Sequence, residues 1–363
     1  MPVSISGTNG VTFPDSSLQA AAASPNVLKN RIINGDMRID QRNAGAAVTT
    51  PDVYTVDRWI QYQGGGGVIS WQQSSTAPTG YNYSLSATVT TADTSLGTTD
   101  YYFLRQFIEG YNVADLDFGT ANAKTVTLSF WVRSSLTGTF GGCLQNGGTN
   151  RFYPFTYTIS AANTWEQKTV TISGDTSGTW LKTNGAGLGV VFALGFGTSY
   201  IGTANAWTSS SFYTATGATN LISTSGATWY VTGVQLEQNT SATPFERRLY
   251  NAELANCQRY YYLMGTPVAN TNYAAGSVVT TSISLGYISP PVTMRVAPTS
   301  IDYSNPRVYY INSGATSTSG TYAIDGNSSN TLITMSYNVA GQTVAYLAIF
   351  NTQSGKLGFS SEL

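Results

Sequence analysis

The chain contains no histidine, only two cysteines and few charged side chains. It has 363 residues, of which 10% are charged, and its formal net charge is −1. The absence of histidine excludes Ser-His-Asp and Cys-His catalysis, and also zinc sites that use histidine. Cys143 and Cys257 lie far apart in dissimilar contexts, which predicts two buried thiols and no disulfide framework.

Two kinds of segment are also missing. Lys and Arg are scattered along the chain, so no basic patch marks a nucleic-acid-binding surface. No apolar run approaches the ~18–20 residues that span a bilayer, and the N-terminus lacks the basic-then-apolar order of a signal peptide. We therefore expect no nucleic-acid partner, no membrane insertion, and synthesis in a cytoplasm.

The abundant residues predict a mostly β protein. Gly (37) and Tyr (24) are frequent, and several segments alternate apolar with polar side chains. One apolar row comprises Val126, Leu128, Phe130 and Val132, and a second comprises Leu188, Val190, Phe192, Leu194 and Phe196. The opposite face of the second row carries Gly189, Val191, Ala193 and Gly195, which predicts close approach by another layer or another subunit. In WYVTGVQLE (229–237) the alternation slips at Gly233, which predicts a β-bulge that keeps both apolar pairs inward.

The order of these patterns predicts four segments. Residues 1–30 have one short strand and too few large apolar groups for a core, which is typical of an attachment segment. Residues 31–243 are predicted to form a jelly-roll-like β-sandwich, 244–265 a helical junction, and 266–363 a smaller distal β domain.

Five charged residues gather in the predicted junction. Thr243, Pro244 and Glu246 match the N-cap, N1 and N3 positions of a capping box. An apolar stripe of Tyr250, Leu254, Cys257 and Tyr261 recurs at helical spacing. Such a helix either lies on its own sandwich or meets its copies on a shared axis, where these four residues would form the oligomer interface. Arg247, Arg248, Glu253 and Arg259 are predicted to solvate its outer face or to pair across subunits.

The junction resembles structural proteins of tailed bacteriophages, of the tail-fibre or minor virion kind. The matching run is VQLEQNTSATPFERRLYNAELANCQRYY, and VTFPDSSLQ, NRIINGDMRIDQR, VDRW and PPVTMRVAPT match more weakly but in the same order. Together these matches touch about a quarter of the chain. The sandwich also resembles carbohydrate-binding jelly-rolls, through IINGDM near its start and YVTGVQLE near its end.

The resemblance implies a non-enzymatic virion fibre protein of the tail or head, located on the phage particle and made in the host bacterial cytoplasm. It implies a homotrimer that contacts other virion proteins through residues 1–30 and recognises a host-surface glycan or protein. The alternative is a purely structural decoration or connector protein of the capsid or tail.

Aromatic side chains are the candidates for ligand binding, because sugar sites combine aromatic platforms with hydrogen-bonding groups. The candidates are Trp71, Tyr81 and Tyr83 in the sandwich and Tyr303, Tyr309, Tyr310, Tyr322 and Tyr337 in the distal domain. The competing interpretation is that these rings simply favour strands.

Carboxylate chemistry is the remaining alternative. Asp115 and Asp117 would lie on the same face of an extended segment, and a turn could bring Asp52 and Asp57 together, as glycoside cleavage requires. Neither pair sits in a catalytic motif. The resemblance to carbohydrate-binding jelly-rolls implies that a structural calcium could lie near the strands IINGDM and YVTGVQLE, with Asp36, Asp40 and Glu237 as oxygen ligands, yet no loop has calcium-binding spacing. We therefore expect no catalytic residue, no metal and no cofactor.

Overall fold

The computed structural model describes residues 4–6, 10–12, 18–19, 29–264, 272–352 and 355–363. Most of the predicted attachment segment at residues 1–30 thus lies outside the described residues. Within it, the sequence predicted one strand, whereas three short strands pair in an antiparallel sheet: β1 (Ser4–Ser6), β2 (Gly10–Thr12) and β3 (Leu18–Gln19).

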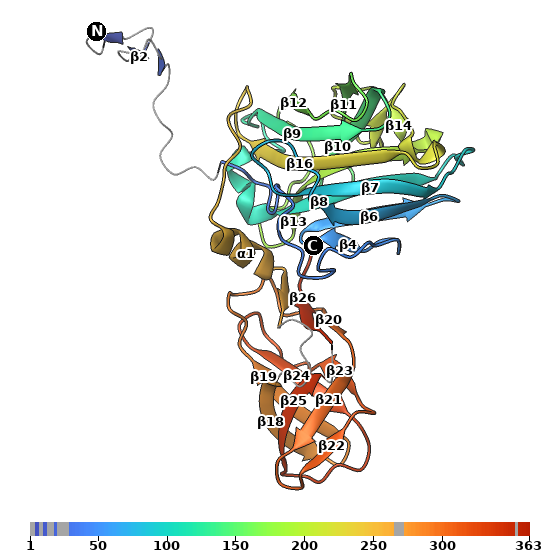
Figure 1. Cartoon of the computed structure of the whole chain (residues 1–363). Coiled ribbons are helices and arrows are strands. Elements are labelled where there is room, and N and C mark those ends of the chain that lie inside the picture. The colour runs from blue at the N-terminus through green and yellow to red at the C-terminus, as the bar shows by residue number, and fades with distance from the viewer. Residues whose placement is uncertain (1–3, 7–9, 13–17, 20–28, 265–271, 353–354) are drawn as a thin grey trace.

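Two antiparallel sheets pack face to face and form the sandwich (Figure 1). One sheet has the strand order β11-β10-β13-β8-β5-β4, and the other has the order β12-β9-β16-β7-β6. Their strands are β4 (Tyr54–Val56), β5 (Trp59–Gly64), β6 (Val68–Ser74), β7 (Ser84–Thr91), β8 (Tyr101–Glu109), β9 (Val126–Ser134), β10 (Gly138–Asn146), β11 (Phe152–Ile159), β12 (Glu166–Ile172), β13 (Ala186–Phe196) and β16 (Thr228–Glu237). Short 3-10 turns are η1 (Gly110–Asn112), η2 (Ala114–Leu116), η3 (Thr198–Tyr200) and η4 (Leu221–Ser223).

The core lies between these two sheets, where the alternating patterns placed it. Phe130 of β9, Phe192 of β13 and Trp229 of β16 are fully buried. The ring centroid of Phe192 lies 5.0 Å from that of Phe130 and 5.5 Å from that of Trp229, so Phe192 packs one sheet against the other. Burial of such side chains is the main favourable contribution to folding.

The predicted bulge in β16 is confirmed. The pairing of β16 with β9 shifts register between Thr232 and Gln235, and Gly233 has a φ of 60°. A Cβ at this glycine would lie 2.7 Å from the hydroxyl of Tyr81, so a larger residue here would be strained and would displace the Tyr81 ring. The apolar residues on both sides of the bulge are buried, namely Trp229, Val231, Val234 and Leu236.

The small-residue face of β13 is covered by another layer of the same chain. Val191 and Ala193 belong to a second apolar cluster with Phe103 and Phe196. Against this cluster lies the excursion of residues 197–215, which contains η3 and the parallel pair β14 (Ile201–Gly202) and β15 (Thr214–Ala215). The predicted close approach is therefore confirmed at Val191 and Ala193. Beyond them the predicted faces are wrong, because a register shift between Ala193 and Gly195 turns Phe196 outward into this cluster and Gly195 toward Ile222 of the core.

The junction helix begins later and ends earlier than the sequence predicted, and Tyr261 of the predicted helical stripe lies in strand β17 (Tyr261–Leu263). Helix α1 spans Tyr250–Gln258, and its N-cap residue, Leu249, makes no side-chain capping bond. The Thr243 hydroxyl instead donates to Glu237 at 2.7 Å. The Glu246 carboxylate accepts from the Asn30 amide at 2.8 Å. The predicted capping box is thus wrong, because both side chains find partners in the sandwich.

The distal domain contains a seven-stranded sheet in the order β22-β21-β25-β18-β19-β24-β23. Its strands are β18 (Asn272–Thr280), β19 (Ile283–Ile288), β21 (Pro306–Tyr310), β22 (Ala315–Ser317), β23 (Thr321–Ile324), β24 (Ile333–Asn338) and β25 (Leu347–Thr352). A second sheet, of β17 (Tyr261–Leu263), β26 (Leu357–Ser360) and β20 (Ser300–Tyr303), lies between this domain and the sandwich (Figure 1). The predicted class, mostly β with a sandwich, a short helix and a smaller distal β domain, is confirmed. Among the described residues, no helix is long and apolar enough to cross a membrane.

Candidate functional site

An aromatic depression lies on the outer face of the six-stranded sheet, away from the core. Its volume is about 200 Å³, and it is lined by Tyr62, Tyr101, Phe103, Arg105, Phe196, Tyr200 and Tyr213. Strands β5, β8 and β13 supply its floor, and the excursion of residues 197–215 supplies Tyr200 and Tyr213. The rings contact one another: Phe103 stacks on Tyr62 at 4.8 Å and on Tyr213 at 5.4 Å between centroids.

The register of the strands assembles this floor. Phe103 pairs with Tyr62 of β5 on one side and with Ala193 of β13 on the other. Side chains alternate between faces along a strand, so Tyr101, Phe103 and Arg105 share the outer face while Tyr102 and Leu104 enter the core. The small side chain of Ala193 leaves room for the rings above the sheet.

Polar groups in the aromatic depression are its phenol hydroxyls and one guanidinium. Arg105 donates a hydrogen bond from Nη2 to the Tyr62 hydroxyl at 2.5 Å. No hydrogen bond within the described residues engages the hydroxyls of Tyr101, Tyr200 or Tyr213. Burial raises the pKa of Tyr213 to about 12, and burial is also the main cause of the raised pKa of Tyr101, with a smaller effect from Asp52. These phenols are therefore neutral donors near neutral pH.

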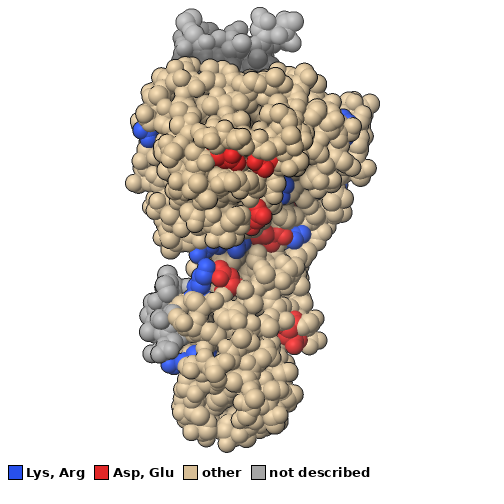
Figure 2. Space-filling view, turned by 90° about the vertical axis from the view of Figure 1, so that its right-hand side faces the viewer, with Lys and Arg blue, Asp and Glu red and all other residues tan. Residues whose placement is uncertain are grey.

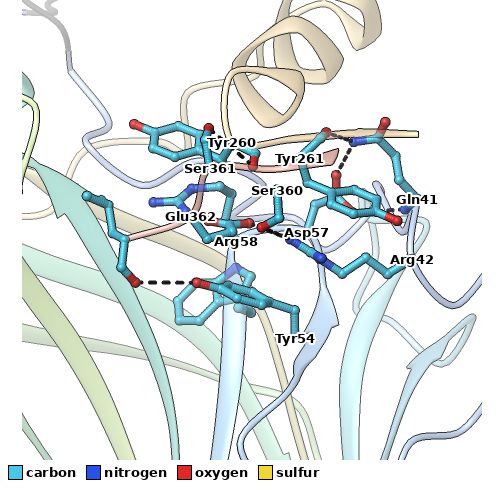
Figure 3. Close-up of polar contacts among 12 residues, drawn as sticks. Gln41, Arg42, Tyr54, Asp57, Arg58, Tyr260, Tyr261, Ser360, Ser361 and Glu362 are labelled. Carbon is cyan, nitrogen blue, oxygen red and sulfur yellow. Dashed lines mark hydrogen bonds and ion pairs between the residues drawn. The ribbon is translucent and has the colours of Figure 1, made fainter. Parts of the chain in front are cut away.

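A second set of polar contacts joins the C-terminus to the sandwich; we name it the charged joint. Figure 2 shows many of the charged side chains on the face drawn gathered where the two domains meet. Figure 3 shows Glu362 reaching Arg58, and Arg42 pairs with the same carboxylate at 3.1 Å. The side chains of Arg58 and Glu362 are only 2% and 7% exposed. Arg58 also lies 3.5 Å from the ring centroid of Tyr260.

Glu109 forms the other half of the charged joint. Its carboxylate accepts from Arg259 Nη2 at 2.6 Å and from the Tyr260 hydroxyl at 2.7 Å. Burial alone would raise the pKa of Glu109, but these hydrogen bonds hold the pKa below its usual value. Arg295 of the distal domain completes the contact, because it donates to the backbone carbonyls of Ser361 at 2.6 Å and Asn184 at 2.9 Å.

Three of the four charged residues predicted to solvate the outer face of α1 pair within the chain, whereas Arg247 is exposed as predicted. Arg248 pairs with Glu253 at 3.1 Å, and the Glu253 side chain is only 5% exposed. Arg259 pairs with Glu109 as described above. Arg247 lies over the Tyr81 ring at 4.6 Å from its centroid.

A polar cleft of about 420 Å³ lies beside the charged joint. It is lined by Arg42, Asn43, Val48, Thr50, Asp52, Val53, Tyr54, Ser300, Asp302, Lys356 and Ser360. Lys356 and Asp302 pair across it at 2.7 Å, so their charges neutralise each other.

The tyrosines predicted as distal ligand platforms meet in the core of that domain. Tyr322 is central, at 5.4 Å from Tyr303 and 5.5 Å from Tyr337 between ring centroids. Tyr310, Tyr322 and Tyr337 are buried, whereas Tyr303 and Tyr309 are half-buried. The structure thus brings most of these rings together to pack the core, as the competing interpretation expected.

The three aromatic residues of the sandwich that were predicted to bind a ligand lie in different places. Trp71 is fully buried against Trp229, with ring centroids 6.5 Å apart. Tyr81 is half-buried beside Phe245, and Tyr83 is 38% exposed. None of the three lines the aromatic depression.

The four residues predicted for an oligomer interface also separate. Cys257 and Tyr261 are fully buried inside the chain, and Cys257 packs with Ile33 and Tyr260. Leu254 is half-buried against the same cluster, and Tyr250 is 55% exposed. Helix α1 therefore lies on its own sandwich in this structure, and Cys257 and Tyr261 offer no surface to a second copy.

The carboxylates considered for catalysis have separate partners. Asp115 pairs with Arg31 at 2.7 Å, and Asp117 lies 3.5 Å from Lys182. They lie in and just after the 3-10 turn η2, and not on an extended segment as predicted. Asp57 is buried and accepts from the Gln41 amide at 2.9 Å, whereas Asp52 is exposed.

Protein donors also satisfy the three carboxylates considered for calcium. Asp36 pairs with Arg38 at 3.2 Å, and Asp40 accepts from the Gly45 amide at 2.7 Å. Glu237 accepts from Gln235 at 2.9 Å. Among the described residues, no three of His, Cys, Asp and Glu gather as a metal site.

Sequence reasoning missed all seven residues of the aromatic depression. The available signal was the stretch YYFLRQF (101–107), which is apolar or aromatic on both faces of a strand. A strand that is apolar on both faces is covered on both, so an outer layer was predictable there. The positions of Tyr200 and Tyr213 above it were not, because they depend on the path of residues 197–215.

Comparison with known proteins gives distant structural likeness only. The sequence matches no family model and no curated protein. A domain of tailspike protein 4 of bacteriophage CBA120 aligns with a TM-score of 0.33 and 12% identity over 59% of this chain and 22% of that chain. A CBM4 structure aligns with a TM-score of 0.32 and 16% identity over 57% and 98%, respectively. The family 11 carbohydrate-binding module of Clostridium thermocellum, in complex with a mixed-linked tetrasaccharide, aligns with a TM-score of 0.29 and 12% identity over 55% of this chain and 100% of that chain. At these identities and TM-scores, the likeness assigns neither a family nor a ligand to this chain.

Proposed function

We propose that the chain is a non-enzymatic bacteriophage virion fibre protein that binds a host-surface glycan through the aromatic depression. The observation that carries the proposal is the depression itself, which combines exposed parts of aromatic rings with hydroxyls that have no partner in the described structure. Concave sites with apolar walls and a few placed polar groups are the usual form of ligand pockets.

The chemistry of the aromatic depression suits a sugar. One face of a pyranose ring presents C–H groups, which pack on aromatic rings, while its hydroxyls exchange hydrogen bonds with phenols such as Tyr200 and Tyr213. The volume of about 200 Å³ is below the ~300–1,000 Å³ typical of pockets for drug-sized ligands. The depression would therefore hold one residue of a chain and leave the remainder in solvent.

The place in a phage particle rests on the resemblance of the junction sequence. A virion fibre would attach to other virion proteins through residues 1–30 and act as a homotrimer, tail- or head-mounted. A single shallow site binds weakly, and three copies on one particle convert weak contacts into stable adsorption. The separate partners of Asp115 and Asp117 support a role without catalysis.

The direct test is binding of the full chain to an array of bacterial surface glycans. Replacing Tyr200 by Ala should weaken binding roughly 10–100-fold, as expected for a central aromatic contact. The matched control is Tyr83→Ala, which removes an exposed tyrosine of the same sandwich outside the depression and should leave the affinity unchanged. Equal effects of the two substitutions, or no bound glycan at all, would contradict the proposal.

One observation favours the alternative of a connector protein. Val279, Ile311, Val344 and Leu347 are 42–53% exposed. Backbone hydrogen bonds from Ile311 to Leu347 and from Val278 to Tyr346 place them at one end of the distal sheet, where β18 and β21 end and β25 begins. Exposed apolar side chains of this kind mark contacts with protein. A connector would bind another purified virion protein through this end and would bind no glycan.

A further inference from the structure

Arg105 is the one charged side chain that lines the aromatic depression. It forms no ion pair with a carboxylate in the described part of the chain, although most other arginines of the sandwich do. Asp52 is near enough to Tyr101 to affect its pKa but makes no ion pair with Arg105. A cation without a counter-charge on an aromatic floor is an open site for an anion.

The guanidinium is fixed in place, yet most of its donors are unused. It lies 4.5 Å from the ring centroid of Tyr62 and 4.1 Å from that of Phe107. Of its five N–H donors, one is used in the hydrogen bond to the Tyr62 hydroxyl. The Nε atom also has no partner but is buried, as in four other arginines of the sandwich, so a ligand would meet the Nη donors. The contacts to both rings restrict its rotamers, so a ligand would find the group already oriented.

We propose that the aromatic depression selects a glycan residue that carries a carboxylate, with Arg105 as the specificity-determining residue. This inference rests on the proposed function, because it names the class of sugar that the same site takes. A carboxylate matches the planar donor edge of a guanidinium, and the surrounding rings exclude water and strengthen the attraction. A neutral sugar of the same shape would leave the cation unpaired.

The test compares one glycan in two chemical forms. Acidic glycans that the full chain binds on the array are offered again after their carboxyl groups have been reduced to hydroxymethyl groups. Reduction should weaken binding about 10–100-fold, because it removes a charge-assisted hydrogen bond. Arg105→Gln should cause the same loss for the acidic form and little change for the reduced form, while Arg105→Lys should restore part of the affinity.

The outcomes distinguish a failure of the charge selection from a failure of glycan binding itself. If the bound glycans are neutral, or if carboxyl reduction leaves affinity unchanged, the charge selection is wrong while glycan binding stands. If only phosphorylated glycans bind, the site selects an anion, but its assignment as a carboxylate is wrong. If no glycan binds, or if Tyr200→Ala weakens binding no more than Tyr83→Ala, the proposed function itself fails. The reduction experiment needs no variant, so a misfolded Arg105→Gln protein would not prevent a decision.

Discussion

Glu362 should contribute strongly to the stability of the sandwich. Its carboxylate is the partner of Arg58 and Arg42, and both it and Arg58 are almost fully buried. Replacing Glu362 by Ala leaves the Arg58 guanidinium buried without a counter-charge. Removing one partner of a buried ion pair costs about 3–5 kcal/mol, because the remaining charge keeps its desolvation penalty.

The expected shift is large enough to measure. For a domain of 150–250 residues, each kcal/mol changes Tm by about 2–4 °C, so Glu362→Ala should lower Tm by roughly 6–20 °C. All seven tryptophans lie between residues 59 and 229. Tryptophan fluorescence therefore follows the sandwich alone, whereas far-UV circular dichroism follows both domains and shows whether they unfold together.

A surface ion pair provides the matched control. Asp117 and Lys182 are 41% and 45% exposed, so Lys182→Ala should cost at most about 1 kcal/mol. The double variant Arg58→Met/Glu362→Ala should be less destabilised than the sum of the two single variants, because it removes the stranded charge. If Glu362→Ala shifts the sandwich transition no further than Lys182→Ala, the reasoning about the buried pair is refuted.

Two further predictions concern the junction. Burial raises the pKa of Asp57 to about 6, so this group contributes stability that is complete below its unfolded pKa of about 3.8 and is lost as pH rises through about 6. Relative to Asp57→Asn, the free energy of unfolding of the wild-type chain should fall by about 2 kcal/mol between pH 4 and pH 7, as measured by urea unfolding, and parallel profiles would contradict this. Leu254→Asp should lower Tm and leave the mass measured by light scattering unchanged, because Leu254 packs on its own chain; dissociation of an oligomer would instead place Leu254 between subunits.

Much of the sandwich was predictable because its signals are local. Alternation along β9 and β13 depends only on which face a side chain takes, and the bulge at Gly233 is visible as a change of parity within nine residues. These patterns determine burial whatever the path of the rest of the chain. The same reasoning located the helix but misplaced its start.

The rest depended on contacts between distant parts of the sequence. Thr243 and Glu246 match a capping box, yet Glu246 binds Asn30, 216 positions earlier. Arg58 and Glu362 are 304 positions apart, and nothing near either residue signals the pairing. The aromatic depression likewise combines strands β5, β8 and β13 with a later excursion. Only the three-dimensional path of the chain brings these groups together.

The two connections between the domains have a mechanical consequence. The chain leaves the sandwich region through β17 and returns through β26, and these strands pair side by side in one sheet. A load applied at the far end of the distal domain is therefore divided between two strands, and no single linker bears it. Bending the distal domain away from the sandwich would also separate Arg295 from the backbone carbonyl of Asn184. The distal domain is thus attached to the sandwich through two paired strands, so it transmits torque as well as tension.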